Sequence, residues 1–184
     1  RRVPARVKQP LQKQTAMNSS WSMDFMSDSL VGSRKFRTFN VIDDCTREVL
    51  AIEIDTSLTS KRVIRTLNRI IEQRGVPKTI RTDNGPEFTS NDFELWCKEI
   101  GIQLQFIQPG KPMQNGYVER FNRLYREAIL DAYLFFDIDE VKQLTLEWME
   151  EYNERRPHEG LNNMTPEEWK QMVVNNQYLQ LVTV

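Results

Sequence analysis

Acidic residues are the main candidates for chemistry in this sequence. The 184-residue chain contains two cysteines and one histidine. A two-histidine metal site within one chain is therefore excluded, and any histidine-based triad would depend on His158 alone. Cys45 and Cys97 form no CxxC pair, which argues against a disulfide framework or a cysteine-rich zinc site and suits a reducing cytoplasm. We therefore expect the chemistry to come mainly from Asp and Glu.

Three acids stand out by their positions: Asp24, Asp83 and Glu119. Asp24 lies inside a predicted strand, where Asp is disfavoured, although a solvated strand face would also accommodate it. Asp83 closes another predicted strand and begins Asp-Asn-Gly, which is also an ordinary turn signal. Glu119 lies near the start of a long predicted helix, where it could instead belong to an exposed row of ion pairs.

The three acids gain weight as a set, because of the elements that position them. An acid on the first strand, one at the end of the fourth strand and one on the following long helix can converge at one end of a mixed sheet. Carboxylate oxygens at such a point are the hard ligands that Mg²⁺ prefers. The set therefore predicts a carboxylate metal site.

The pattern along the chain predicts one mixed α/β domain. Three β-rich segments joined by short polar turns are typical of an antiparallel meander, and the apolar period then changes to helical spacing. The predicted strands cover residues 21–26, 36–42, 49–54, 78–82 and 102–107, and the predicted helices cover 60–74, 91–100, 115–132 and 139–153. A last helix is predicted from Thr165 as N-cap, with Pro166 at its first position and Glu168 completing a capping box. The expected architecture is a five-stranded mixed sheet flanked by helices, with extra C-terminal helices.

Charge divides the chain unevenly. Residues 1–14 carry five basic side chains and no acid, while the net charge of the whole chain is −1, so the remainder is mildly acidic. We expect a basic linker or arm at 1–19, a core at 20–174 and a C-terminal tail at 175–184. The arm could be a solvated linker or a DNA-contacting segment. No apolar run of membrane-spanning length and no signal peptide are found in the sequence, so no membrane partner is expected.

The joint pattern resembles a known family. The spacing of 35 residues between Asp83 and Glu119, and the strings that cover residues 82–88 and 114–122, are similar to the integrase catalytic core of insertion-sequence transposases. The nearest likeness is to the IS3 family, and retroviral integrases are more distant relatives. The resemblance runs from about residue 20 to 172. It includes a tail pattern made of Tyr152-Asn153, Arg156-Pro157-His158, Leu161 and Thr165-Pro166.

The resemblance implies an RNase H-like fold and a DDE-type catalytic domain, one that cleaves and joins DNA strands during transposition. It implies that Asp24, Asp83 and Glu119 hold two Mg²⁺ ions, for which Mn²⁺ can substitute, with Asp24 bridging both. Two such ions activate the attacking oxygen and stabilise the leaving one in phosphodiester transfer. No covalent protein nucleophile is needed, which fits a chain that lacks a credible nucleophile–base pair.

The resemblance also implies DNA contacts and partners. Arg123 and Arg126 are expected to contact phosphates of the transposon end, unless they form ion pairs with neighbours such as Glu119 and Glu127. The expected partners are transposon-end DNA, target DNA and a second copy of the chain, in the bacterial cytoplasm and at the nucleoid when bound to DNA. Family members usually add upstream helix-turn-helix modules. Further DNA contacts are expected from a loop rich in Pro and Gly and from the residues that follow it, namely Lys111, Gln114 and Asn115.

Other residues and functions compete with this interpretation. Asp43 and Asp44 stand before a turn, where Asp often caps its own backbone, and we expect a structural role for both. His158 is expected to serve packing or capping. A nuclease of the same fold, such as an RNase H or resolvase, would share the acids but would not predict the tail pattern or Arg126. A non-catalytic DNA- or protein-binding module is the third hypothesis, and the intact acids argue against it.

Overall fold

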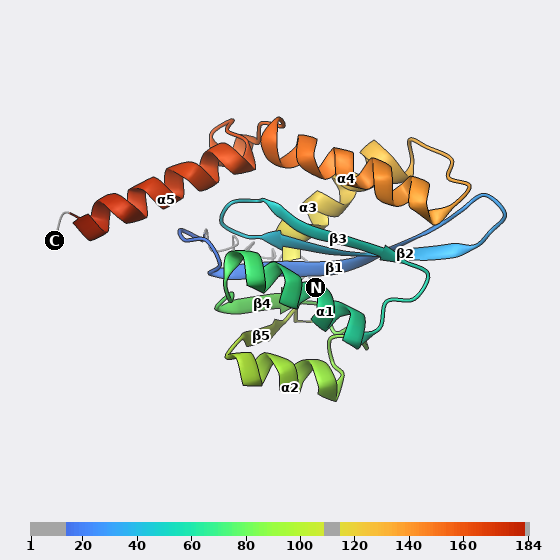
Figure 1. The fold of residues 1–184 in the computed structure, drawn as a ribbon, viewed down its shortest axis with the longest axis horizontal. Helices are drawn as coiled ribbons and strands as arrows, with labels where there is room; N and C mark the ends of the chain where they lie inside the picture. Colours follow the sequence, from blue (N-terminus) through green and yellow to red (C-terminus); the bar gives the residue numbers. More distant parts are fainter. Residues whose placement is uncertain (1–13, 109–114, 183–184) are drawn as a thin grey trace, which may run out of the picture.

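A mixed five-stranded sheet organises the protein, in a computed structural model that describes residues 14–108 and 115–182 (Figure 1). The strand order is β3-β2-β1-β4-β5. The pairs β1–β2 and β2–β3 are antiparallel, whereas β1–β4 and β4–β5 are parallel. The predicted sheet, three antiparallel strands followed by two more, is therefore confirmed. The strands are β1 (Ser20–Ser29), β2 (Lys35–Asp43), β3 (Val49–Asp55), β4 (Thr79–Thr82) and β5 (Gln103–Phe106).

Helices cover both faces of the sheet, and each face has its own apolar core. One core lies between the sheet and the pair α1 (Ser60–Arg74) and α2 (Asn91–Ile100). The other core lies between the sheet and the pair α3 (Gly116–Tyr125) and α4 (Ile138–Glu154). Helix α5 (Pro166–Val182) follows and extends away from the body of the domain (Figure 1).

Local sequence signals begin and end these helices as predicted. The Ser90 side chain accepts a hydrogen bond from the Phe93 N–H at 3.3 Å, which caps the start of α2. Gly101 ends this helix with φ of 84°, a left-handed conformation in which glycine avoids the steric cost of a Cβ. The predicted capping box of α5 is confirmed, because Thr165 Oγ1 accepts from the Glu168 N–H at 3.2 Å and Glu168 Oε2 accepts from the Thr165 N–H at 2.8 Å.

One predicted helix boundary differs from the structure. The long helix predicted to reach residue 132 is regular only to Tyr125 and continues as a π-helical turn, Arg126–Leu130. The Asp131 N–H donates to the Arg126 carbonyl at 2.8 Å. This wider turn accompanies the burial of two successive apolar side chains, Ile129 and Leu130.

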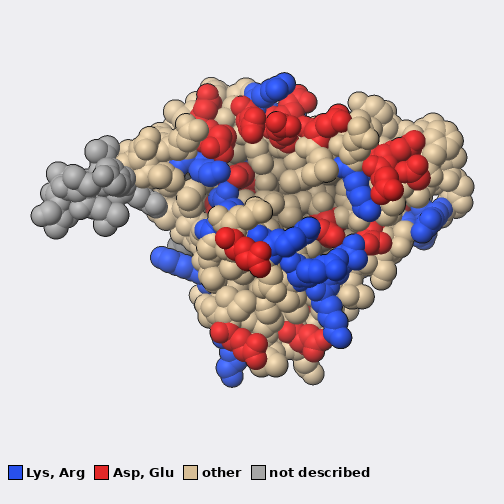
Figure 2. Space-filling view, in the orientation of Figure 1, with Lys and Arg blue, Asp and Glu red and all other residues tan. Residues whose placement is uncertain are grey.

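Positive and negative side chains are interspersed over the face of the molecule shown in Figure 2. Lys and Arg side chains gather near the middle of this face, over the region of α1, with acidic side chains beside them. The sequence of α1 contains five basic residues and one acid. Among the described residues, none of the helices has the length and apolar composition that a membrane span requires.

Candidate carboxylate site

The alternation of side chains along β1 sets the direction of Asp24. Trp21, Met23 and Phe25 belong to the core beneath α1 and α2, whereas Met26 belongs to the core beneath α3 and α4. Because successive strand residues point to opposite faces, Asp24 lies on the α3 side of the sheet. Its Oδ1 accepts a hydrogen bond from the Phe25 N–H at 2.8 Å, and the side chain is half-buried. The first acid of the predicted set therefore faces the helix that carries the third.

Asp83 follows β4 directly and is exposed at the end of this strand. Its Oδ1 accepts a hydrogen bond from the Gly85 N–H at 3.0 Å. A Cβ at position 85 would lie 3.0 Å from that same carboxylate oxygen. Any other residue would therefore crowd the carboxylate, so Gly85 allows this close approach. Asp-Asn-Gly therefore forms a turn, as its composition indicates, and the same turn holds the Asp83 carboxylate in place.

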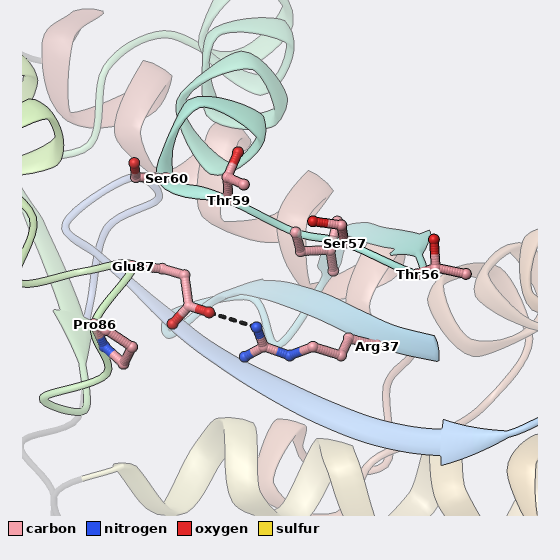
Figure 3. A pocket seen from close by; sticks show the side chains of 8 residues that line it. Arg37, Thr56, Ser57, Thr59, Ser60, Pro86 and Glu87 are labelled. Carbon is pink, nitrogen blue, oxygen red and sulfur yellow. Dashed lines mark hydrogen bonds and ion pairs between the residues drawn. The ribbon is translucent and has the colours of Figure 1, made fainter. Parts of the chain in front are cut away.

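The loop after Asp83 is attached to the sheet by an ion pair between Arg37 on β2 and Glu87 (Figure 3). The Arg37 guanidinium also lies 4.2 Å from the centroid of the Phe25 ring, next to Asp24 in the chain. An open pocket of about 380 Å³ lies beside this pair, lined by hydroxyl-bearing residues of the segment from β3 to α1. None of the three candidate acids lines this pocket. The pocket is related to the carboxylate site only through its lining residues Arg37 and Glu87, whose ion pair positions the loop after Asp83.

Glu119 lies in the first turn of α3 and is exposed. An acidic side chain is favoured there by the positive end of the helix dipole. The position of α3 is fixed by Val118 and Phe121, which are buried in the core between this helix and the sheet. Asn115, the N-cap residue, is 2% exposed, and its Nδ2 donates to the Met23 carbonyl at 3.5 Å. The start of α3 is thus attached to the strand that carries Asp24.

The charges of Asp83 and Glu119 act on Asp24. The pKa of Asp24 is raised to about 6, mainly by burial, and these two carboxylates act in the same direction against the hydrogen bonds from the Phe25 N–H and from Asn122. Asp24 is therefore a carboxylate whose negative charge is opposed by its surroundings. The three predicted acids are brought into electrostatic contact from a strand, a strand end and a helix.

This donor set fits a divalent cation. Asp83 and Glu119 disfavour the negative charge of Asp24, the three carboxylates offer hard oxygen ligands, and a cation would relieve the repulsion on Asp24. Within residues 14–108 and 115–182, no three His, Cys, Asp or Glu side chains are already grouped closely enough to hold a metal ion. We infer that the carboxylates must rotate toward a cation as it binds.

An asparagine pair that the sequence analysis missed supports Asp24. Asn122 Nδ2 donates to Asp24 Oδ2 at 2.8 Å, and Asn122 Oδ1 accepts from Asn40 Nδ2 at 2.7 Å. Asn40 is fully buried and stands directly opposite Asp24 in the β1–β2 register. Asn122 comes three residues after Glu119, so helical spacing places both on one side of α3. That spacing was a usable signal for Asn122, whereas Asn40 becomes identifiable only once the strand register is known.

Substitution of Asn122 with Ala should weaken metal binding without unfolding the protein. The variant removes a hydrogen bond that favours ionised Asp24, so the pKa of Asp24 should rise further. Loss of a partner that orients a ligand typically lowers metal affinity about 10–100-fold. The unpaired Asn40 amide should also cost about 1–3 kcal/mol of unfolding free energy. Calorimetric Mn²⁺ titration and urea denaturation would measure both effects, with Asn91→Ala, an exposed position on α2, as control. Unchanged Mn²⁺ affinity would contradict the role of Asn122.

The predicted DNA-contacting residues have different environments. Arg123 is exposed on α3, as expected for a phosphate contact. Arg126 instead donates to Asp28 Oδ2 and to the Ser27 carbonyl, both at 3.0 Å. It also pairs with Asp131 at 3.5 Å. These acids are not the sequence neighbours, Glu119 and Glu127, that were considered as alternatives. A phosphate would therefore compete with Asp28 for Arg126.

Of the other three residues predicted to contact DNA, the structure describes only Asn115. Lys111 and Gln114 lie outside the described residues. Asn115 is buried against β1, and its amide is used for the Met23 carbonyl. Because this side chain is almost fully enclosed, the structure gives Asn115 a role in positioning α3 in place of a direct DNA contact. Its polar character alone could not distinguish the two roles.

The structural roles expected for Asp43 and Asp44 agree with their contacts. Asp43 Oδ1 accepts hydrogen bonds from the backbone N–H groups of Cys45 and Thr46 at 2.8 and 3.1 Å, so it caps its own turn as predicted. Asp44 accepts from the Ser22 hydroxyl and pairs with Arg81 at 3.1 Å. Both acids are completely buried. They belong to a charged network beside the start of β1, and the two partners of Asp44, Ser22 and Arg81, lie two residues before Asp24 and Asp83.

His158 serves packing, as predicted. Its ring stands edge-on to the Tyr152 ring, with centroids 4.8 Å apart. Burial lowers the pKa of His158 to about 4, and nearby guanidinium groups lower it in the same direction. The imidazole is therefore neutral at pH 7 and does not take part in the carboxylate site.

Comparisons with known proteins agree with this geometry. The sequence profile of a family described as "Integrase core domain" matches residues 14–112, more than half of the chain, and a second profile with the same description matches residues 100–166. A 31.7 kDa protein of insertion element IS407 from Burkholderia multivorans is 40% identical over 154 residues. These residues are 84% of this chain and 56% of that protein. A 39.2 kDa protein of insertion element IS476 from Xanthomonas euvesicatoria is 37% identical, over 89% of this chain and 47% of that protein. The chain thus spans about half the length of these relatives.

Solved structures share the fold at lower identity. The integrase catalytic core domain of HTLV-2, in complex with magnesium in a trimeric form, superposes with a TM-score of 0.65 at 22% identity. The match covers 84% of this chain and 97% of that one. The catalytic core domain of BIV integrase superposes with a TM-score of 0.63 at 21% identity, over 88% of this chain and 99% of the other. These matches confirm the RNase H-like fold expected from the sequence.

Proposed function

Because the chain belongs to the integrase core domain family, we propose that it is the catalytic core of a transposase that cleaves DNA and joins the resulting 3′ ends to target DNA. The observation that carries the proposal is the convergence of three carboxylates from separate elements. Asp83 at the end of β4 and Glu119 on α3 act electrostatically on Asp24 in β1. A protein with no metal-dependent chemistry would gain nothing from this mutual repulsion.

We propose that Asp24, Asp83 and Glu119 hold two Mg²⁺ ions, which Mn²⁺ can replace. When bound, such ions neutralise phosphate charge and activate the attacking water or 3′-hydroxyl. The protein contributes the three elements that carry the ligands. Asn122 holds one oxygen of Asp24 and the Gly85 N–H holds the Asp83 carboxylate, so both carboxylates rotate toward a cation from defined starting positions. The magnesium present in the HTLV-2 neighbour supports a divalent cation at this fold.

We propose that the substrates are transposon-end DNA and target DNA. Arg123 is available for a phosphate contact, and Arg126 becomes available if DNA displaces Asp28 from it. Lys111 and Gln114 remain proposed DNA contacts from the neighbouring loop. Self-association in the active complex, which joining two ends requires, and a place of action at bacterial DNA in the cytoplasm complete the proposal. The insertion-element relatives of this chain support the bacterial setting.

A calorimetric Mn²⁺ titration of the protein is the first test. Mn²⁺ is preferred as the probe because it stands in for Mg²⁺ and usually binds such oxygen sites more tightly than Mg²⁺ does. Saturable binding is expected for the wild type and should be lost in Asp24→Asn and in Asp83→Asn. Asp92→Asn, which alters an exposed acid at the start of α2, is the matched control and should bind like the wild type. Equal binding by all four proteins would contradict the assignment of these acids.

Strand joining then separates the proposed function from its rivals. A labelled DNA with a free 3′-hydroxyl end should become covalently joined to a second duplex in the presence of Mn²⁺. Cleavage without joining would favour a nuclease of the same fold. Neither reaction, together with no metal binding, would favour a non-catalytic module.

A further inference from the structure

Three arginines from separate segments surround one side of α3, and we call Arg47, Arg120 and Arg156 the arginine cluster. Arg47 lies in the turn between β2 and β3, and its guanidinium carbon is 3.2 Å from the centroid of the Tyr117 ring in the first turn of α3. Arg120 comes three residues after Tyr117, so helical spacing places it on the same side of α3. Arg156 follows the end of α4. The tail pattern of the sequence thus contributes to this cluster.

Packing beneath the cluster brings the end of α4 to α3 and β3. Asn153 makes two hydrogen bonds to Val49, accepting from its N–H at 2.9 Å and donating to its carbonyl at 3.0 Å. The Tyr152 ring stands edge-on to Phe121 of α3, with centroids 5.2 Å apart, and contacts His158 on its other side. The members of the tail pattern therefore support the segment that carries Arg156.

The positive charges of all three arginines act on the His158 side chain. Burial lowers the pKa of His158 to about 4, and the charges of Arg156, Arg120 and Arg47 contribute in the same direction. Three guanidinium groups thus lie within electrostatic range of one buried imidazole. The imidazole stays neutral at pH 7 and adds no charge of its own. Its Nε2 is buried and has no hydrogen-bond partner in the part of the chain that the structure describes.

The arginines of the cluster lack ion-pair partners among the described residues, although the charge of Arg47 also acts on buried Asp44. Considering only residues 14–108 and 115–182, none of the three arginines forms an ion pair. Arg120 and Arg156 are exposed, and Arg47 is half-buried and donates to the Asp44 carbonyl. The basic surface over α1 differs (Figure 2), because several of its arginines pair with acids of the β2–β3 turn and of β3. Unpaired exposed charge in a chain of net charge −1 indicates a surface that binds an anion.

We propose that the arginine cluster binds backbone phosphates of a DNA strand, at a site separate from the carboxylates. Guanidinium groups match phosphate oxygens in a bidentate manner and stay charged at any physiological pH. Tyr117 holds Arg47 in place through the cation–π contact. Glu119 lies between Tyr117 and Arg120 in the sequence of α3. One short helix therefore presents a carboxylate to the catalytic site and an anion-binding surface beside it. This inference rests on the proposed function for the identity of the anion.

DNA binding at several salt concentrations tests the proposal. The protein is titrated into a fluorescent duplex of arbitrary sequence in EDTA, so that metal binding and catalysis play no part. Arg120→Gln combined with Arg156→Gln should flatten the slope of log K against log salt by about 0.9 per arginine. The control combines Arg69→Gln with Lys142→Gln, which removes two exposed charges that are already paired with acids. This control should keep the wild-type slope. Thermal melting checks that all variants are folded.

The outcomes test the arginine cluster separately from the proposed strand-joining function. An unchanged slope in the Arg120/Arg156 variant would overturn the arginine cluster, even if the wild type joins DNA strands in Mn²⁺. A flattened slope would support the cluster as a DNA surface, even if the wild type joins nothing and the proposed function fails. A wild type that does not bind the duplex would overturn the proposal. Loss of binding to a poly-glutamate peptide with an unchanged DNA slope would assign the cluster to an acidic protein partner instead.

Discussion

Asp24→Asn is expected to abolish strand cleavage and joining while making the metal-free protein more stable at pH 7. Loss of the acid that faces both other carboxylates should remove metal stabilisation worth several kcal/mol. Each 1.36 kcal/mol corresponds to a factor of ten in rate, so activity should fall by about 10³-fold or more. The opposite effect on stability follows from the pKa of Asp24, which is raised from 3.8 to about 6 in the folded protein.

The pH dependence of stability has a definite sign. Between pH 4 and 6 the folded state holds a proton on Asp24 that the unfolded state has released, so stability falls as pH rises through this range. Below pH 4 both states are protonated, and above pH 6 the loss is complete. A shift of about two pKa units corresponds to about 3 kcal/mol. Asp24→Asn should recover about 1–3 kcal/mol of this at pH 7 and should remove the decline between pH 4 and 6.

Urea denaturation in EDTA across pH 3.5–8 would measure this effect. The matched control is Asp28→Asn, four residues along the same strand, because Asp28 pairs with Arg126 at 3.0 Å and its removal should not stabilise the protein. Mn²⁺ should raise the melting temperature of the wild type and leave that of Asp24→Asn unchanged, since binding to the folded state alone stabilises it. A less stable Asp24→Asn protein would contradict the electrostatic description of the site.

Phe121→Ala is expected to have the largest effect on stability, about 3–5 kcal/mol of unfolding free energy. Phe121 is 1% exposed and contacts three aromatic rings. Tyr125 stacks on it at 6.4 Å between centroids, and Trp148 and Tyr152 of α4 approach to 5.7 and 5.2 Å. Removing this ring leaves a cavity between α3 and α4. Because Glu119 is two residues away on the same helix, metal affinity should fall as well.

Leu146→Ala provides the control for this substitution. Leu146 lies on α4 but is 67% exposed, so its truncation should change the unfolding free energy by less than about 0.5 kcal/mol. Phe121→Leu should fall between the two, since it keeps part of the buried volume. Urea denaturation with a fixed m-value would rank the three variants. A Phe121→Ala protein as stable as Leu146→Ala would show that the aromatic cluster does not hold α3 to α4.

Much of the fold and the acids of the candidate site could be predicted because they depend on local patterns. The alternation in residues 20–29, the helical spacing in 60–74 and the capping box at Thr165 each act over a few residues, and each predicted the element found there. The order of the acids along the predicted strands and helix gave the convergence of Asp24, Asp83 and Glu119. Predicting that these acids lie near one another required only the order of the strands and helices, because that order places the end of β4 and the start of α3 near β1.

Contacts between distant segments could not be predicted in the same way. Asn40 reaches Asp24 only through Asn122, which is 82 residues further along the chain than Asn40. Arg126 pairs with Asp28 across 98 residues, so a search among its helical neighbours found the wrong partners. Asn115, one of the residues expected to contact DNA, is buried against β1. These features depend on strand register and on how α3 lies on the sheet, which no local pattern contains.

The central place of β1 determines when the site can exist during synthesis. This strand pairs with its successor β2 on one side and with β4, beyond α1, on the other. A nascent chain can therefore form the three-stranded meander with only Asp24 present. At about 5–20 residues per second, a ribosome needs roughly 5–20 s to pass from Asp24 to Glu119. Until then the emerging chain carries an incomplete set of the proposed ligands, so the proposed metal site can form only after all five strands of the sheet have been synthesised.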